Sequence, residues 1–219
     1  MTPTDASARR TSARGLRRRQ LLLDAAAELL MTRGFAAVSH RAVAQHAELS
    51  LSSTTYYFES LDELLEGAVR QLAEGWLADA GAVVAELPRQ LDDPRALAEA
   101  LVHVAVQGPA GEPATDSGTL LSLYDRYLEA ARHPRMRPVV AEYDDRIEAL
   151  LIDVLRRRTG SLDAAAGESR RTARLVLAVI DGAVLRALAE GLPVATATTT
   201  LEHLLTALAI GGTHPRRRA

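Results

Sequence analysis

Residues 39–58, SHRAVAQHAELSLSSTTYYF, constrain the fold of this chain more than any other segment. Ser39 can cap the N-terminus of a first short helix with one apolar face, and Ser50 can cap a second helix, which ends at Phe58. Only a three-residue break separates the two apolar patterns, and this spacing fits a helix-turn-helix that binds DNA. The apolar face of the first helix comprises Val43, Ala44 and Ala47.

The second short helix is rich in hydroxyl groups. Serine and threonine are poor helix formers, because their side chains compete for backbone hydrogen bonds. Beside two tyrosines, however, short hydroxyls suit a surface that must approach phosphates and base edges closely. A polar loop between two ordinary helices is the alternative interpretation. The residues concerned are Ser52, Ser53, Thr54, Thr55, Tyr56 and Tyr57.

Amphipathic helices are predicted on both sides of this segment. Residues 17–33 carry apolar side chains at helical spacing, and Gly34 ends that helix. Ser60 and Glu63 form an S-x-x-E capping box that opens another helix. The N-terminal part of the chain is therefore predicted to form a compact helical head.

These features together resemble the TetR family of bacterial one-component transcriptional regulators over residues 17–69. The resemblance implies an all-α chain, with an N-terminal three-helix helix-turn-helix domain joined to a C-terminal helical ligand-binding and dimerisation domain. The motifs that carry it are Gly34-Phe35, Val43-Ala44 through Ala47, and Ser50 through Tyr56-Tyr57-Phe58-Glu59-Ser60 to Leu64-Leu65.

Three residues depart from the family pattern. Glu48 stands where glycine is common in the turn, so either the turn has another shape or Glu48 adopts a left-handed backbone at a cost of about 1 kcal/mol. Leu51 and Leu61 stand where lysines that contact DNA phosphates are frequent. Two phosphate contacts are therefore expected to be missing.

Matching positions in the family imply which residues contact DNA. His40 and Arg41 would meet the backbone or a base edge, and Arg41 suits a guanine because its charged guanidinium can donate two parallel hydrogen bonds. Leu51 can offer only an apolar contact, and Tyr57 a hydrogen bond to a phosphate. The predicted DNA-binding residues are Arg17, Arg18, His40, Arg41, Ser50, Leu51, Ser52, Ser53, Thr55, Tyr56 and Tyr57.

A basic N-terminal arm is predicted to compensate for the missing contacts. Residues 1–16 contain little that could be buried and are expected to be disordered, whereas residues 17–65 are assigned to the helix-turn-helix domain. Residues 1–60 contain eight arginines against five acids, a net charge of +3, while the remainder carries −5. Such an arm can bind the phosphate backbone or a minor groove in a salt-dependent way. A solvated tail without a partner is the alternative, and it is our interpretation of the basic tail at 212–219.

The composition favours a helical protein without a cofactor. Its 219 residues are 47% hydrophobic but only 4% aromatic, and none is cysteine, so a disulfide or a thiolate metal site is excluded. Neither a metal nor a cofactor is expected. The sequence has no run of about 18 apolar residues that could span a bilayer, and its arm lacks the apolar core of a signal peptide. We therefore expect a cytoplasmic protein without a membrane partner.

Residues 66–211 are assigned to a helical effector-binding and dimerisation domain. Asp93-Pro94 is expected to open one helix, and residues 108–118 to form a flexible loop. Thr199 and Glu202 are expected to open the last helix with a capping box. Helices are predicted at about 61–87, 94–105, 120–131, 134–158, 169–190 and 199–210.

The last two helices are predicted to form a homodimer contact. They are apolar over more than one face, and such a helix needs two neighbours. One neighbour would be its own domain and the other a second subunit related by a two-fold axis, as the family resemblance also implies. A purely intramolecular core is the alternative. The predicted interface residues are Leu175, Val179, Gly182, Ala183, Arg186, Leu201, Leu204, Leu205 and Leu208.

Polar groups at otherwise apolar positions of the C-terminal helices are candidates for the effector pocket that the resemblance implies. His103 could instead be a core histidine bound to a carbonyl, and Asp181 could pair with an arginine. The tyrosines could hold a ligand or pack in the core with wet hydroxyls. Because aromatic residues are scarce, a small hydrophobic effector is favoured. The candidates are Trp76, His103, Tyr124, Tyr127, Tyr143 and Asp181.

No catalytic motif supports an enzyme. The sequence has no Gly-rich phosphate loop, no H-E-x-x-H and no nucleophile elbow, and the acids at 142–148 are spread around a helix. We expect a DNA-binding regulator. It would be a dimeric repressor that binds a near-palindromic double-stranded DNA operator, and a small molecule would release it from the DNA. The alternative is a dimeric helical binding module without sequence-specific DNA recognition.

Overall fold

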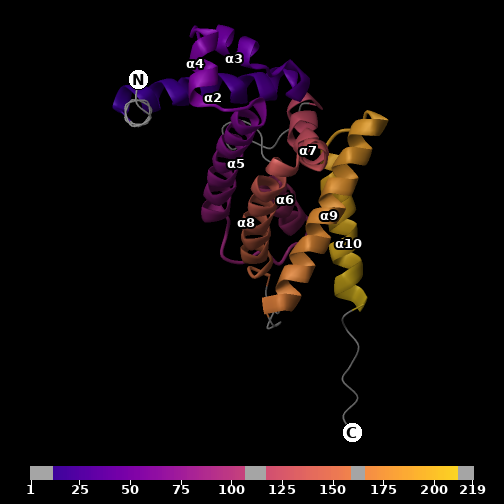
Figure 1. The fold of residues 1–219 in the computed structure, drawn as a ribbon. Coiled ribbons are helices and arrows are strands. Elements are labelled where there is room, and N and C mark those ends of the chain that lie inside the picture. The colour runs from indigo at the N-terminus through magenta and orange to yellow at the C-terminus, as the bar shows by residue number, and fades with distance from the viewer. Residues whose placement is uncertain (1–11, 107–116, 159–165, 212–219) are drawn as a thin grey trace. The chain divides into compact units, whose positions relative to one another are not determined.

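A computed structural model describes residues 12–106, 117–158 and 166–211, and this part of the chain contains helices and no strands (Figure 1). The predicted all-α class is confirmed. In chain order the elements are α2 (Ala13–Arg33), η1 (Phe35–Ala37), α3 (His40–His46), α4 (Leu51–Tyr57), α5 (Leu61–Glu86), α6 (Pro94–Ala105), α7 (Ser117–Arg132), η3 (Pro134–Met136), α8 (Arg137–Leu155), α9 (Ala166–Glu190) and α10 (Ala195–Gly211).

The chain divides into two compact units. The first comprises the described residues of Met1–Gly75 and Gly118–Tyr143, and the second those of Trp76–Ser117 and Asp144–Ala219. The sequence placed a boundary near residue 65, but α5 continues without interruption to Glu86. The head therefore includes most of α5 up to Gly75 and, unexpectedly, α7 with the start of α8.

Helix α2 begins earlier than predicted. Ser12 is its N-cap, because the Ser12 Oγ accepts a hydrogen bond from the amide of Gly15 at 3.2 Å. Residues 13–16 are therefore helical, and their assignment to a disordered arm is wrong. At the other end, Gly34 has a φ of 73° and donates its N–H to the carbonyl of Leu30, as predicted for a helix end. The rest of the arm, residues 108–116 of the predicted loop and the tail at 212–219 lie outside the described residues. The last two residues assigned to that loop, Ser117 and Gly118, instead begin α7, so this part of the loop prediction is wrong.

One apolar core holds the first unit together. Leu22 and Ala26 of α2, Val43 of α3, Phe58 after α4 and Leu64 of α5 are almost completely buried in it. The corner between α7 and α8 packs into the same core. Its contributions are Ala130, Met136, Val139 and Val140.

Polar contacts also connect this corner to α5. His133 lies with its Nδ1 3.4 Å from a carboxylate oxygen of Asp62, in the first turn of α5. Glu142 of α8 accepts a hydrogen bond from Arg70 of α5 at 2.8 Å. The corner between α7 and α8 therefore adjoins the helix that directly follows α4.

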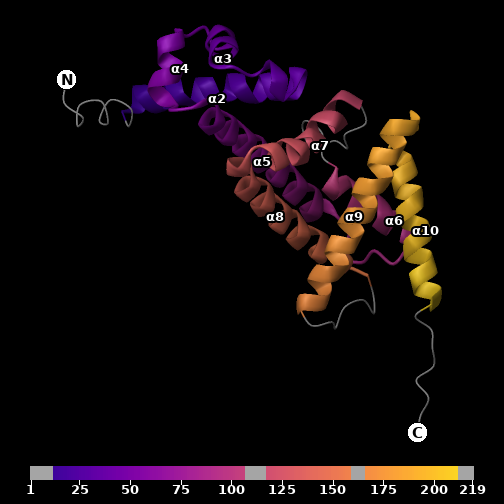
Figure 2. The same cartoon turned by 45° about the vertical axis from the view of Figure 1, so that its right-hand side comes forward.

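In the second unit, α10 packs against α6 and α9 (Figure 2). Asp93 accepts a hydrogen bond from the amide of Ala96 at 3.0 Å and Pro94 occupies the first turn, so the predicted start of α6 is confirmed. The predicted start of α10 is wrong. The helix begins at Ala195, and the Thr199 hydroxyl donates to the Ala195 carbonyl inside it rather than capping it.

Three arginines form hydrogen bonds within the second unit. Arg157 donates hydrogen bonds to the carbonyls of Val84 at 2.7 Å and Leu87 at 2.6 Å, at the C-terminus of α5, where the last helical carbonyls have few backbone donors. Glu148 is buried and accepts hydrogen bonds from Arg170 and Arg174 of α9 at 3.1 and 2.7 Å. The hydrogen bond to Glu148 and the charge of this carboxylate raise the pKa of Arg174 above its ordinary value. Among the described helices, none is both long and apolar enough to cross a membrane.

Candidate DNA-binding interface

The helix-turn-helix consists of α3 and α4, as predicted. The Ser39 Oγ accepts a hydrogen bond from the amide of Ala42 at 3.1 Å and so caps α3. Glu48 has a φ of 53°, which settles the two alternatives at this position in favour of a left-handed backbone. The next amide, that of Leu49, donates to the carbonyl of Ala44 at 2.9 Å and closes the turn.

The hydroxyl groups of α4 divide between the core and the surface. Thr54 is fully buried, and its hydroxyl donates to the carbonyl of Leu51 at 2.8 Å. Ser50 occupies the N-cap position, but its Oγ is hydrogen-bonded to those of Ser52 and Ser53, each at 2.9 Å. The predicted capping of the backbone by this side chain is therefore wrong. The three serines instead form one connected group of surface hydroxyls.

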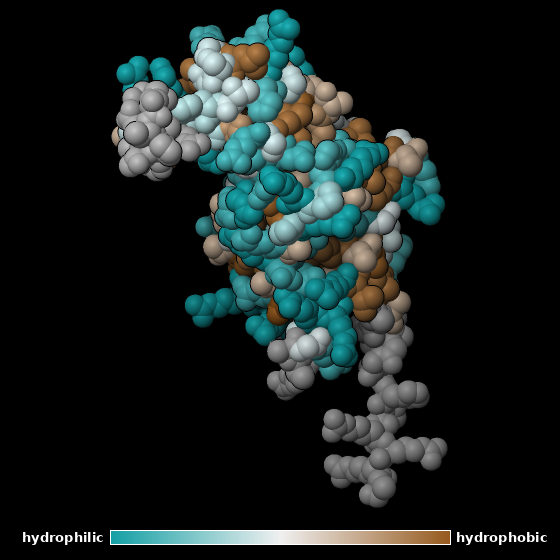
Figure 3. Space-filling model, in the orientation of Figure 1, coloured by the Kyte–Doolittle hydropathy of each residue, from teal (hydrophilic) through white to brown (hydrophobic). Residues whose placement is uncertain are grey.

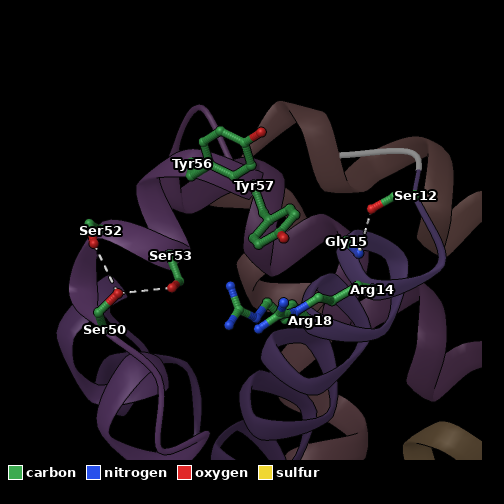
Figure 4. Close-up of a pocket in the computed structure, with 9 residues that line it drawn as sticks. All are labelled: Ser12, Arg14, Gly15, Arg18, Ser50, Ser52, Ser53, Tyr56 and Tyr57. Carbon is green, nitrogen blue, oxygen red and sulfur yellow. Dashed lines mark hydrogen bonds between the residues drawn. The ribbon is translucent and has the colours of Figure 1, made fainter. Parts of the chain in front are cut away.

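A groove of about 680 Å³ lies between the N-terminal turns of α2 and the hydroxyl face of α4 (Figure 4). Arg14 and Arg18 extend into it from α2, and Ser53 and Tyr57 face them from α4. Within the described part of the chain, neither arginine forms an ion pair with a carboxylate. The groove therefore combines two positive charges with several hydroxyl donors. Its lining residues are Ser12, Arg14, Gly15, Arg18, Ser50, Ser52, Ser53, Tyr56 and Tyr57.

The four arginines at the start of α2 have different positions. Arg18 lines the groove as predicted for a DNA-binding residue, and so does Arg14, which the sequence analysis left in the arm. The spacing of four residues between them was the available signal, because it places both on one helix face. Arg17 is exposed but does not line the groove. Arg19 lies over the ring of Phe58, with 5.0 Å between its Cζ and the ring centroid.

The remaining predicted DNA contacts lie on α3 and α4. Arg41 is exposed in the first turn of α3, and its neighbour His40 is half-buried. The Nδ1 of His40 is buried and has no hydrogen-bond partner among the described residues. Tyr56 and Tyr57 contact each other edge to face, with 5.0 Å between ring centroids, and Tyr57 packs against the head core.

The predicted effector residues are distributed over both units. Trp76, His103 and Asp181 belong to the second unit, where Trp76 is buried and the other two are half-buried. Tyr124, Tyr127 and Tyr143 belong to the first unit. These three are close together, since the rings of Tyr124 and Tyr127 are 6.5 Å apart and one arginine lies against both Tyr127 and Tyr143. That arginine, Arg126, was not singled out in the sequence.

The predicted dimer residues separate into a surface group and a core group. On α9, Leu175 is 68% exposed, Gly182 and Arg186 are exposed, and Val179 and Ala183 are half-buried. Apolar surface follows α9 and α10 on the face shown in Figure 3. On α10, Leu201 and Leu205 are buried within the unit, so they belong to its core and not to its surface. Leu204 is half-buried, and the side chain of Leu208 lies outside the described residues.

Comparison with known families covers both units. Residues 22–68 match the family described as bacterial regulatory proteins, tetR family. Residues 92–209, more than half of the chain, match the family described as tetracyclin repressor-like, C-terminal domain. The chain belongs to the TetR family. It is a transcriptional regulator with a helix-turn-helix and a helical C-terminal domain.

Several characterised TetR-family proteins are similar to this chain over most of their length. The nicotine-responsive transcriptional repressor HdnoR of Paenarthrobacter nicotinovorans is 27% identical over 79% of this chain and 84% of its own. The transcriptional regulator BetI of Agrobacterium fabrum is 32% identical over 77% and 76%. The solved structure of the multidrug binding protein EbrR complexed with proflavin is 34% identical, covers 87% of this chain and 99% of its own, and has a TM-score of 0.63.

The cations that face α4 in this TetR-family chain come from α2. Leu51 is 51% exposed at the start of α4, and Leu61 is half-buried at the start of α5, so neither supplies a cation at the sites where the family often has lysine. Arg14 and Arg18 supply two cations from α2 instead. The positive charge that faces α4 therefore comes mainly from the neighbouring helix.

Proposed function

We propose that this regulator is a homodimeric repressor, which binds a near-palindromic operator and is released by a small hydrophobic effector in its C-terminal helices. The observation that carries the DNA-binding part is the groove between α2 and α4. Two arginine guanidinium groups and a group of serine and tyrosine hydroxyls line it together. A phosphate of the DNA backbone is an anion that such a combination binds well. The adjoining exposed residues Arg41 and Leu51 are then available to base edges.

The exposed surface of α9 supports the homodimer. Leu175 and Leu185 are 68% and 45% exposed, and a Cβ at Gly182 would meet nothing within 4 Å. An apolar surface around a small residue suits close approach of a second copy of the same helix. A single α4 of seven residues also buries too little surface for tight and specific binding. Two heads related by a two-fold axis would contact half-sites about 34 Å apart.

The similar proteins support an effector. HdnoR is described as nicotine-responsive and EbrR as a multidrug binding protein, so two of the similar proteins are described by small molecules to which they respond or bind. For this chain, the proposed ligand contacts are described within each unit. They are the group of tyrosines on α7 and α8 in the first unit, and Trp76, His103 and Asp181 in the second. An effector that prefers the DNA-incompatible state about 100-fold would shift operator affinity by about 2.7 kcal/mol. We also propose that the protein acts in the cytoplasm and has no catalytic activity, because the similar proteins are transcriptional regulators.

Selection of bound sequences from a pool of random double-stranded DNA tests this function without knowledge of the operator. We expect enrichment of one motif with two inverted half-sites, and protection of both half-sites when the protein is bound to it. Enrichment of no motif, with binding that depends only on salt, would overturn the proposal. It would favour the alternative of a helical module that binds surfaces through its basic arm.

A further inference from the structure

A positively charged side chain occupies the centre of the predicted tyrosine group. Arg126 of α7 is only 5% exposed. Its Cζ lies 4.6 Å from the ring centroid of Tyr127 and 4.3 Å from that of Tyr143. Its Nη2 also donates a hydrogen bond to the Tyr127 hydroxyl at 3.2 Å, which fixes the orientation of the guanidinium. We call Tyr127 and Tyr143 the tyrosine pair.

This arrangement is one that proteins use to bind organic cations. The face of an aromatic ring is electrostatically negative, and a cation within about 6 Å of its centroid is attracted to it, more strongly when both are shielded from water. Both distances to Arg126 lie well inside this limit. The tyrosine pair thus has the chemistry of a cation site, and a side chain of the protein itself occupies that site.

We propose that Arg126 is a built-in cation that closes the tyrosine pair to organic cations and so determines the class of effector. The proposal rests on the proposed function of effector binding. A ligand cation at the same rings would have to displace the guanidinium or lie within a few ångströms of it, where two positive charges repel strongly because little water screens them. A neutral, apolar effector meets no such repulsion. Arg126 is then a specificity-determining residue.

The test measures cation binding to the full-length protein and to the variant Arg126→Ala. The probes are methylguanidinium, which matches the space that the substitution vacates, and proflavin, a planar aromatic cation. We expect the wild type to bind methylguanidinium no better than on the order of 1 mM by calorimetry. Arg126→Ala should bind it at least about tenfold more tightly. The double variant Arg126→Ala/Tyr143→Leu should lose this gain, because one of the two rings is absent.

Arg132→Ala is the matched control, since Arg132 lies on the same helix and its side chain is 65% exposed. It should bind both probes as the wild type does. No gain in cation affinity for Arg126→Ala would overturn the proposal, and so would a gain that persists in the double variant.

One further measurement keeps the proposal testable if Arg126→Ala does not fold. In the wild type, methylguanidinium should leave the near-ultraviolet circular dichroism of the tyrosines unchanged, because the pair is closed to cations. A saturable change of this signal would show that cations reach the pair despite Arg126 and would overturn the proposal. DNA binding by the same preparations tests the proposed function separately. If no operator were found, the proposed function would fail, but the cation affinities of wild type and variants could still be compared.

Discussion

Replacement of Arg18 by alanine should weaken DNA binding and also make it less sensitive to salt. Arg18 is one of two cations that line the groove between α2 and α4. A hydrogen bond to a charged group contributes about 1.5–3 kcal/mol, so affinity at low salt should fall roughly 10- to 150-fold. Each phosphate that a cation neutralises contributes about 0.9 to the slope of log K against log salt. Loss of one such contact should therefore make the variant less sensitive to salt. The ratio of wild-type affinity to variant affinity should fall about 3.5-fold when the salt concentration rises from about 50 to 200 mM.

The assay is fluorescence anisotropy with labelled operator and with scrambled DNA over a salt series. Both DNAs should lose affinity to the same extent, because a phosphate contact carries no sequence information. Arg17→Ala is the sharpest comparison, since Arg17 has the same charge one residue earlier but does not line the groove. An effect of Arg17→Ala as large as that of Arg18→Ala, or an unchanged salt slope for Arg18→Ala, would refute this assignment of the groove.

Three further predictions concern recognition, assembly and stability. Arg41→Ala should reduce the difference in binding free energy between matched and mismatched operators by about 1–3 kcal/mol, whereas Tyr57→Phe should weaken binding to all DNA alike. Equal losses of affinity on matched and mismatched operators for both variants would contradict this assignment. Leu175→Glu should raise the dimer dissociation constant at least about 100-fold in sedimentation experiments, because the two-fold axis places two carboxylates in one apolar contact; a dimer of unchanged affinity would exclude this surface. Arg157→Met should lower the free energy of unfolding in urea by about 1–3 kcal/mol, since it removes the hydrogen bonds that the carbonyls of Val84 and Leu87 accept from the guanidinium. Arg156 is an exposed neighbour, so Arg156→Met should change the free energy of unfolding by less than about 0.5 kcal/mol. Similar values for the two variants would show that Arg157 does not stabilise the end of α5.

Local signals allowed several helix ends to be predicted. The caps at Ser39 and Asp93 and the helix end at Gly34 each depend on residues that are adjacent in the sequence. Such features can therefore be predicted from the neighbouring residues alone. The same kind of signal was present at Ser12, where an N-cap starts α2 earlier than the apolar pattern does. For Glu48 the sequence left two alternatives, of which the structure has the left-handed backbone.

Features that depend on packing between distant segments could not be predicted in this way. The apolar pattern of α10 does not distinguish Leu201 and Leu205, which face the core, from residues that could contact a second subunit. Likewise, nothing near Met136 indicates that the corner between α7 and α8 packs into the core of the head. Arg126 was missed because a buried arginine resembles a surface arginine in sequence. Its environment depends on the ring of Tyr143, on another helix, as well as on that of the neighbouring Tyr127.

The most direct test of the account is the affinity of the purified protein for the DNA that flanks its own gene, measured by fluorescence anisotropy against scrambled DNA across a salt series. We expect tight, sequence-selective binding that saturates at one or two dimers per site. Selectivity should persist at salt concentrations where binding to scrambled DNA is lost. Equal, weak and steeply salt-dependent binding to both DNAs would contradict operator recognition at this site, and no binding even at low salt would contradict the assignment of the groove and α4 to DNA.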